Sequence, residues 1–330
     1  MQDPRSILVI ALRRLGDVIL TVPALEALKK RFPSAKLDLL VEAPGAQAVA
    51  GCAALDEVLI YDAVSMRGSL QWIRRIRSRR YDWVIDFLAN PRTALLTAFS
   101  GAAVKAGPAH VPRRWAYNHL MRQSPQACYG AVEKVRWLSG LGVPPCPDDT
   151  IPRLSIGQRP QRADNVVGLV PPSRKDTRRW PAASYARLGR LLRDQHGCRL
   201  KVFWGPGERD LAAEVVRGIG RAACATGETR ALSELAKELL ECRVVVTNCS
   251  GPKHLAVALG VPTVTIHSSS DPASWTPPHR DHLFVRVDEL HCIGCGLNDC
   301  PYNLECLTQL PAERVLPAVA QLLERVGVSQ

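Results

Sequence analysis

The sequence is poor in the features that membrane-spanning and nucleic-acid-binding proteins need. Aromatic residues make up only 5% of the 330 residues, and no apolar run approaches the ~20 residues that span a bilayer. Interleaved aromatic residues, zinc-finger spacing and RNP-like motifs are missing, which argues against nucleic-acid recognition. We find neither a short internal repeat nor a low-complexity segment. These absences leave a folded globular chain.

The start of the chain does not have the pattern of a secretory signal. Asp3 and Arg5 precede a short apolar run at 7–12, and two arginines and a Gly-Asp pair follow at once. This pattern predicts a first β-strand. In such a chain, most of the 11 cysteines are expected to be reduced core residues. We therefore expect a cytoplasmic protein.

Acidic residues are scarce relative to basic ones. The chain has 43 Lys and Arg against 31 Asp and Glu, and residues 64–136 hold 13 of the former and 3 of the latter, a net charge of +10. This excess predicts an acidic partner, which is a phosphorylated sugar, an anionic lipid surface or a nucleic acid. A solvated helix face is the simpler alternative.

Two halves of the chain repeat the same alternation of apolar runs and amphipathic stretches, which predicts an α/β protein with parallel sheets. The length suits two domains. A stretch rich in Pro, Asp, Gln and Arg at 143–164 predicts a linker, with the boundary near 159–164. In the first half the expected strands are 7–12, 36–41, 57–61 and 81–87, and the expected helices are 18–32, 68–80 and 92–100. In the second half the expected strands are 166–170, 199–204, 244–247 and 263–267, and the expected helices are 182–195, 208–218, 231–241 and 251–259.

A Gly-Asp pair lies at the expected turn from the first strand to the first helix. Gly16 permits a tight turn, and Asp17 then begins the helix. The simplest role of Asp17 is that of an N-cap, which Asp fills well. At the edge of an α/β sheet it is also placed to act as a general base on an acceptor hydroxyl. The turn lacks GxGxxG, so it is not a dinucleotide fingerprint.

The residues Thr-Asn-Cys-Ser-Gly-Pro-Lys-His at 247–254 follow an apolar strand and open a helix. Backbone N–H groups at a helix start bind anions. Pro252 suits the first turn, and Lys253 adds positive charge. A plain helix capped by Ser250 is the alternative. The position of the turn after a strand favours a phosphate site.

Two further loops follow strands of the second half. The loop at 172–181 carries four cations, which suit a diphosphate, although a solvated basic loop with Trp180 as a packing anchor is also open. The loop at 204–208 places Glu208 where an acid binds ribose hydroxyls. A first-turn acid that favours the helix dipole is the alternative for Glu208.

In this order the four motifs resemble the heptosyltransferase family, glycosyltransferase family 9. Residues 7–28 look like the opening of the family, with Gly-Asp and then Thr-x-Pro-Ala-Leu. Residues 248–262 look like its donor-binding signature, and 265–277 are similar to the loop that follows. The resemblance implies the GT-B fold, with two Rossmann-like domains facing across a cleft. It also implies an inverting, metal-independent transfer of a heptose from an ADP-linked donor to the lipopolysaccharide core.

The same resemblance assigns roles to individual residues. It implies that Asp17 is the general base and that Arg178 contacts the donor phosphates, where the family usually has a lysine. The remaining donor-binding candidates are Glu208, Asn248, Cys249, Ser250, Gly251, Lys253 and His254. Candidates for holding an anionic, lipid-linked acceptor are Arg13, Arg14, Arg67 and Arg92. The expected partners are therefore the donor, this acceptor and the cytoplasmic face of the inner membrane, and not nucleic acid.

Cys249 departs from the family pattern, which usually has Asp between the Asn and the Ser. A thiol does not replace the two acceptor oxygens of a carboxylate. The departure leaves a second hypothesis open, in which the protein binds a nucleotide sugar but is catalytically lapsed or tuned to another donor.

The C-terminal segment carries four cysteines at 292–306, spaced Cys-x2-Cys-x4-Cys-x5-Cys, as in many relatives. The four thiols, Cys292, Cys295, Cys300 and Cys306, suit a structural zinc ion or an iron–sulfur cluster. Reduced or disulfide-paired cysteines are the alternative. Residues 312–325 predict an amphipathic helix. The expected domains are 1–160 for the acceptor and 161–310 for the donor, with 311–330 packing back on the first, as the last helix of GT-B proteins often does.

Overall fold

The computed structural model describes residues 2–154 and 165–327, which fall into two compact units. Unit 1 is Met1–Ser155 and unit 2 is Ile156–Gln330. The linker boundary expected near 159–164 lies outside the described residues. No helix in the described ranges is long and apolar enough to cross a membrane.

Unit 1 is built on a six-stranded sheet whose neighbouring strands are all parallel. The strand order is β3-β2-β1-β4-β5-β6, which is the Rossmann order. Buried on both faces, the central strands are nearly continuous apolar runs. The strands are β1 (Ser6–Ala11), β2 (Lys36–Val41), β3 (Glu57–Ile60), β4 (Trp83–Asp86), β5 (Val104–Pro108) and β6 (His119–Met121).

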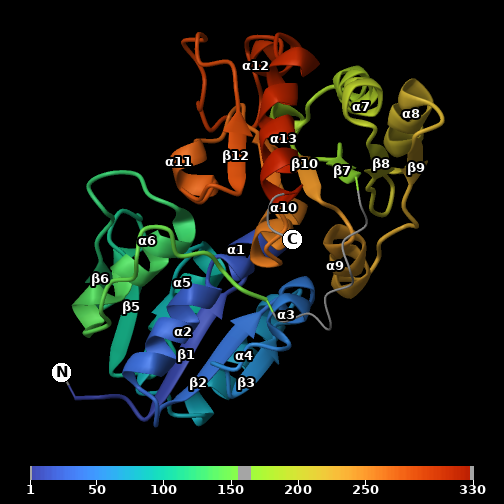
Figure 1. The fold of residues 1–330 in the computed structure, drawn as a ribbon. Coiled ribbons are helices and arrows are strands. Elements are labelled where there is room, and N and C mark those ends of the chain that lie inside the picture. The colour runs from blue at the N-terminus through green and yellow to red at the C-terminus, as the bar shows by residue number, and fades with distance from the viewer. Residues whose placement is uncertain (1, 155–164, 328–330) are drawn as a thin grey trace. The chain divides into compact units, whose positions relative to one another are not determined.

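Helices cover both faces of this sheet (Figure 1). Side chains of β1 alternate between two cores, because successive residues of a strand point to opposite faces. The expected helix 18–32 is two helices, α1 and α2, with Pro23 in the first turn of the second. The helices are α1 (Leu15–Ile19), α2 (Val22–Arg31), α3 (Ala43–Val49), α4 (Met66–Ser78), α5 (Pro91–Ala98) and α6 (Gly130–Trp137), with 3-10 turns at Arg114–Ala116 and Leu138–Leu141.

Unit 2 repeats the architecture. Its sheet is also parallel throughout, in the order β12-β11-β10-β7-β8-β9. The strands are β7 (Val166–Val170), β8 (Arg199–Val202), β9 (Ala223–Ala225), β10 (Val244–Asn248), β11 (Thr263–Ile266) and β12 (His282–Val285). The helices are η3 (Asp176–Arg178), α7 (Ala182–His196), α8 (Arg209–Ile219), α9 (Leu232–Leu240), α10 (Gly251–Ala258), α11 (Pro272–Trp275), α12 (Glu305–Thr308) and α13 (Ala312–Gly327). The expected α/β class with parallel sheets is confirmed.

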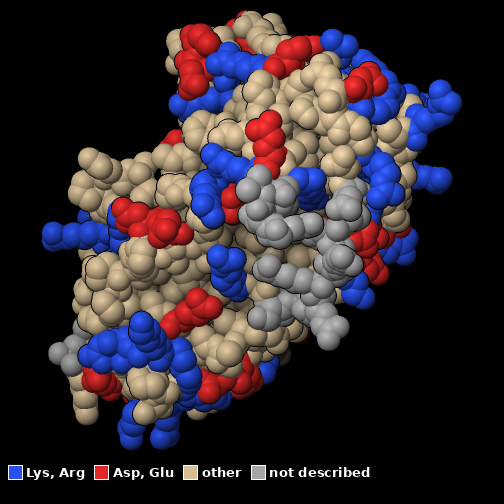
Figure 2. Space-filling view, in the orientation of Figure 1, with Lys and Arg blue, Asp and Glu red and all other residues tan. Residues whose placement is uncertain are grey.

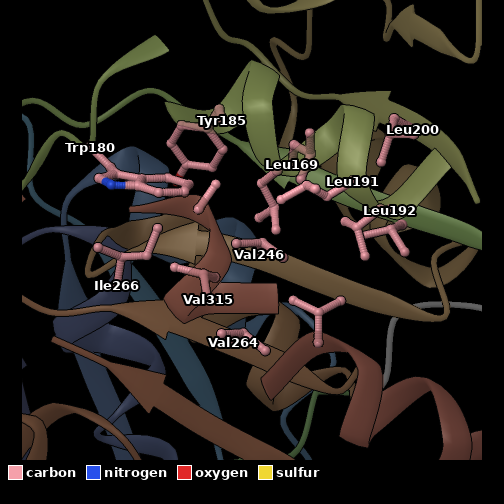
Figure 3. Close-up of a cluster of buried hydrophobic side chains, with 14 of the residues drawn as sticks. Leu169, Trp180, Tyr185, Leu191, Leu192, Leu200, Val246, Val264, Ile266 and Val315 are labelled. Atoms are coloured by element: carbon pink, nitrogen blue, oxygen red, sulfur yellow. The ribbon is translucent and has the colours of Figure 1, made fainter. Parts of the chain in front are cut away.

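The core of unit 2 contains the last helix of the chain. Val315 of α13 lies among Leu169, Val246 and Ile266 of the sheet (Figure 3). Contacts of α13 with α7, β10, β11 and β12 agree with this position. The apolar face of this helix is therefore buried in unit 2, where the sheet and α7 cover it. The packing of residues 311–330 on the first domain stays a prediction.

Trp180 is the packing anchor at the start of α7. Its indole is fully buried and meets the Tyr185 ring edge-on, with 4.8 Å between the centroids. The indole Nε1 donates a hydrogen bond to the Leu310 carbonyl oxygen at 3.1 Å. The polar end of the ring is thus satisfied inside the core.

Candidate functional site

The predicted donor residues of unit 2 all follow the carboxyl ends of strands. Arg178 follows β7, Glu208 follows β8, and residues 248–254 follow β10. Because the strands are parallel, these ends meet at one edge of the sheet, where α/β folds bind ligands. The structure therefore brings the donor candidates to a common edge.

Asn248 is a scaffold of this edge. Its side chain is fully buried, and its Nδ2 donates to the Pro171 carbonyl oxygen at 2.8 Å. Its Oδ1 accepts a hydrogen bond from the backbone N–H of Trp180 at 3.1 Å. The amide thus ties the end of β10 to the loop that carries Arg178, and it positions the site.

Ser250 stands at the N-cap position of α10 but does not cap the helix. Its backbone is extended, and its hydroxyl oxygen is buried without a hydrogen-bond partner among the residues that the structure describes. The capped-helix alternative for Ser250 is therefore wrong. A buried hydroxyl without a partner costs free energy, and beside a helix start it is a ready donor to an anion.

Two cations lie close together at this helix start. Lys253 is completely buried, and its ammonium donates a hydrogen bond to the Trp275 carbonyl oxygen. Burial lowers the pKa of Lys253 to about 8; Cys249 acts to raise this pKa, and the positive charge of Arg178 acts to lower it. Neither cation forms an ion pair with a carboxylate within the described ranges. The site therefore carries positive charge that an anion would compensate.

Arg178 is held at the edge by its neighbour Thr177. The Thr177 hydroxyl donates to the Leu297 carbonyl oxygen at 3.1 Å, and its carbonyl oxygen accepts from the Ser268 hydroxyl at 2.6 Å. The Arg178 Nε is buried and has no partner among the described residues. A guanidinium with an unused buried donor suits a phosphate oxygen.

The loop after β11 is fastened by a neutral histidine. The ring of His267 contacts the Ser270 hydroxyl through Nδ1 and the Thr276 hydroxyl through Nε2, both at 2.8 Å. Burial lowers the pKa of His267 to about 3, and the charge of Lys253 adds to this effect. This loop also presents Trp275, whose ring meets that of His254 edge-on at 5.8 Å.

Glu208 occupies the N-cap position of α8, at the end of the loop that follows β8. Its Oε2 accepts a hydrogen bond from the Gly205 N–H at 2.9 Å. Gly207 has a φ of +80°, which favours glycine. The other carboxylate oxygen accepts no hydrogen bond in the described part of the chain, so one oxygen is available for a ligand.

Asp17 in unit 1 is not an N-cap. Helix α1 begins at Leu15 with Arg14 in the cap position, so Asp17 lies in the first turn. Its carboxylate is 18% exposed and 3.8 Å from the Arg13 Nη1. It accepts no hydrogen bond from any described residue, so the oxygens are available to take a proton.

The four acceptor candidates share the edge of the sheet on which Asp17 lies. Arg13 and Arg14 follow β1, Arg67 is in the first turn of α4 after β3, and Arg92 is in the first turn of α5 after β4. The Arg92 Nη1 lies 3.4 Å from a Glu42 carboxylate oxygen.

Sequence reasoning missed one cation beside Asp17. Lys134 of α6 is buried, and burial lowers its pKa while the Asp17 carboxylate acts to raise it. Nothing in the local sequence signals this, because Lys134 lies among apolar residues of an amphipathic helix. The proximity of Lys134 to Asp17 arises from tertiary packing, in which α6 packs on α2, the helix that follows α1.

The four cysteines of 292–306 are free thiols around Cys306. Burial raises the pKa of Cys306 to about 11, and the charges of Cys300, Cys292 and Cys295 add to the rise. Cys300, Cys292 and Cys295 are thus each within electrostatic reach of Cys306. In the described ranges, however, no three His, Cys, Asp or Glu side chains are gathered closely enough to hold a metal ion.

Two parallel sheets in the Rossmann strand order define the GT-B fold, which solved heptosyltransferase structures share. The chain belongs to glycosyltransferase family 9 (heptosyltransferase), whose family model matches residues 69–303. It is therefore a glycosyltransferase.

Known relatives and solved structures agree with this family. Lipopolysaccharide heptosyltransferase 1 of Pseudomonas aeruginosa is 27% identical over 320 residues, which cover 90% of this chain and 88% of the relative. A family 9 glycosyl transferase from Veillonella parvula has a similar fold, with a TM-score of 0.83, 23% identity and 97% coverage of both chains. The E. coli heptosyltransferase WaaC with ADP-2-deoxy-2-fluoro heptose gives a TM-score of 0.74 at 24% identity, covering 97% of this chain and 99% of that chain.

Proposed function

We propose that this enzyme transfers a heptose from an ADP-linked donor to an anionic lipopolysaccharide-core acceptor. The observation that carries the proposal is that Arg178 acts electrostatically on Lys253 in the first turn of α10, where the Ser250 hydroxyl has no hydrogen-bond partner among the described residues. Two cations and a hydroxyl donor suit the diphosphate of ADP-heptose. The E. coli relative bound to a fluorinated ADP-heptose supports this donor class.

In the proposed reaction Asp17 is the general base. It takes the proton of the acceptor hydroxyl while that oxygen attacks the anomeric carbon of the heptose. The bond from this carbon to the diphosphate breaks, and ADP leaves with the electron pair. Attack opposite the leaving group inverts the anomeric configuration. Arg178 and Lys253 stabilise the charge on the departing diphosphate, which is a role that a metal ion fills in other transferases.

The remaining donor contacts follow from the edge of unit 2. The open carboxylate oxygen of Glu208 accepts hydrogen bonds from the ribose hydroxyls, and the first N–H groups of α10 at Gly251 face the phosphates. His254, ordered by Trp275, lines the sugar pocket. On the acceptor side, Arg13, Arg14, Arg67 and Arg92 bind carboxylate and phosphate groups of the core oligosaccharide.

Replacing Asp17 tests the base. Asp17→Ala is expected to lower kcat with ADP-heptose and a Kdo-bearing acceptor by about 10²- to 10⁴-fold. Because Asp17 belongs to unit 1, the Kd of ADP measured by calorimetry is expected to stay within about twofold. Asp149→Ala, at an exposed carboxylate, is the matched control. Full activity of Asp17→Ala would refute the assignment.

Cys249 motivates a second candidate function, nucleotide-sugar binding without turnover or with another donor. The thiol is buried beside Lys253, where a carboxylate would neutralise the ammonium. Under the main proposal, Cys249→Asp does not increase turnover of ADP-heptose. A large gain would instead indicate a lapsed or retuned donor site, and a mass spectrum of the co-purified nucleotide sugar would name its donor.

The acceptor of the proposed reaction is lipid-linked, so we propose that the enzyme works at the cytoplasmic face of the inner membrane. Transfer to acceptor embedded in vesicles, compared with transfer to the same oligosaccharide freed of lipid, tests whether a membrane surface raises the rate.

We also propose a structural metal, zinc or an iron–sulfur cluster, at Cys292, Cys295, Cys300 and Cys306. Four thiols match the ligand preference of both, and the electrostatic effect of Cys300, Cys292 and Cys295 on Cys306 supports the site. Their spread in the structure means that binding must draw them together. Elemental analysis of purified protein is expected to give about one zinc or one cluster per chain, and to give neither after all four are replaced by serine. Absence of metal from the unaltered protein would leave the cysteines as reduced thiols.

A further inference from the structure

The start of helix α4 presents three large apolar side chains to solvent. Val64 is 102% exposed, Met66 is 85% exposed and Leu70 is 53% exposed. Met66 and Leu70 are four residues apart, so they stand one above the other on the helix. Three such side chains in seven residues are costly to expose to water.

The same side of α4 carries arginines that have no acidic partner. Arg74 and Arg77 continue the row of Met66 and Leu70, at spacings of four and three residues, and Arg67 flanks it. All three are exposed, and none forms an ion pair within the described residues. Arg79, on the other side, instead contacts the Glu57 carboxylate at 2.6 Å. The outer row is therefore purely cationic and apolar.

The opposite side of α4 is fixed to the sheet. Trp72 and Ile76 are buried against Leu8 and Ile10 of β1. The Trp72 Nε1 donates to an Asp62 carboxylate oxygen at 2.9 Å, and the Ser65 hydroxyl caps the helix by accepting from the Gly68 N–H at 3.2 Å. The outer row is therefore held on a rigid helix. On the face of the molecule that Figure 2 shows, basic and acidic side chains are interspersed.

We propose that the outer row of α4, Val64, Met66, Leu70, Arg74 and Arg77, docks on an anionic phospholipid surface. Apolar side chains beside arginines are the pattern of helices that lie in a membrane interface. Each arginine near an anionic surface contributes about fivefold to the partition coefficient, and the apolar side chains enter the headgroup boundary. This docking proposal rests on the proposed function in one respect, because a lipid-linked acceptor gives the enzyme a reason to bind a membrane.

Sedimentation with vesicles tests the surface. The full chain is expected to bind vesicles of phosphatidylcholine and phosphatidylglycerol at 3:1, to bind pure phosphatidylcholine at least tenfold less, and to dissociate as salt is raised. Arg74→Gln with Arg77→Gln is expected to lower the partition coefficient by about 25-fold, and Met66→Ser with Leu70→Ser by at least tenfold. Leu120→Ser, which alters an apolar side chain that is 41% exposed in β6, is the matched control and is expected to bind as the unaltered chain.

Equal binding by the double variants, or equal binding to both vesicle types, would overturn the proposal. If the unaltered protein does not bind vesicles but dimerises, and Met66→Ser with Leu70→Ser abolishes the dimer, the proposal is overturned. The outer row would then be an interface between two copies of the chain. Transfer to a lipid-free acceptor is measured on the same variants and is expected to be unchanged. Vesicle binding without heptose transfer would refute the proposed function alone, and transfer without vesicle binding would refute the docking surface alone.

Discussion

The guanidinium of Arg178 lies close enough to Lys253 for its positive charge to disfavour the charged form of the ammonium. One is on α10 and the other on the loop after β7, so they are joined only by the fold. Two like charges are held together at the cost of repulsion, which binding of a diphosphate would relieve. The free protein is thus prepared for an anion.

Removing the Lys253 charge is expected to weaken ADP binding. Lys253→Met keeps the length of the side chain but removes a charged hydrogen-bond donor, which is worth about 10- to 100-fold in affinity. Calorimetry with ADP gives the measurement. Lys237→Met, at an exposed lysine of α9, serves as the control and is expected to keep the affinity of the unaltered chain. An unchanged Kd in Lys253→Met would place the diphosphate elsewhere.

The affinity for ADP is expected to fall as pH rises through about 8. In the free protein the pKa of Lys253 is lowered to about 8, and an anionic ligand prefers the charged ammonium. Above this pH binding must also take up a proton, so affinity falls by up to about tenfold per pH unit. Calorimetry between pH 7.5 and 9.5 measures the slope. The same slope in Lys253→Met would assign the titration to another group.

The stability of the ligand-free protein is expected to respond to pH in the opposite sense. An unfolded Lys253 titrates near the ordinary value of 10.5, whereas the folded one loses its proton near 8. Between these values the unfolded chain binds more protons, so the Lys253 contribution to the free energy of unfolding rises with pH. Urea unfolding of the unaltered chain and of Lys253→Met, compared at pH 7.5 and 9.5, isolates this contribution. A difference between the two proteins that does not change with pH would contradict it.

Ser250→Ala is expected to separate ligand binding from helix capping. Because the Ser250 hydroxyl makes no cap hydrogen bond and is buried without a partner among the described residues, its loss is expected not to lower the free energy of unfolding. ADP affinity is expected to fall severalfold, because a donor to the phosphates is lost. Ser65→Ala, at a hydroxyl that does cap a helix, is expected to cost about 1 kcal/mol. Equal stability losses in both variants would show that Ser250 caps α10 in solution.

Tyr117→Phe is expected to destabilise unit 1. The Tyr117 hydroxyl donates to the Asp86 Oδ2 at 2.9 Å in a fully buried site, where burial raises the pKa of Asp86. Losing this partner is expected to cost about 1–3 kcal/mol in urea unfolding. Tyr61→Phe, at a half-buried contact with Ser69, is the control and is expected to cost less. A smaller loss in Tyr117→Phe than in Tyr61→Phe would mean that water reaches Asp86.

Most strands of the two sheets were predictable, including β3 at one edge, whereas β5, β6, β9 and β12 were not. β1, β2, β7 and β10 are apolar runs, and their length and their flanking turns identify them. β6 and β9 have three residues each, and β5 contains a lysine and a proline. Such segments become strands because a neighbour offers them a hydrogen-bonding partner, which the local sequence does not record.

The sequence by itself determined which residues follow strand ends, and hence the edge of each sheet where Asp17, Arg178 and Lys253 lie. Apolar runs, Gly and Pro mark these turns locally. Only the tertiary structure decided that Ser250 leaves its hydroxyl unused, that Lys253 reaches Trp275, and that α13 belongs to unit 2. Each of these depends on segments far apart in the chain, whose contacts arise from packing and not from local conformational preference.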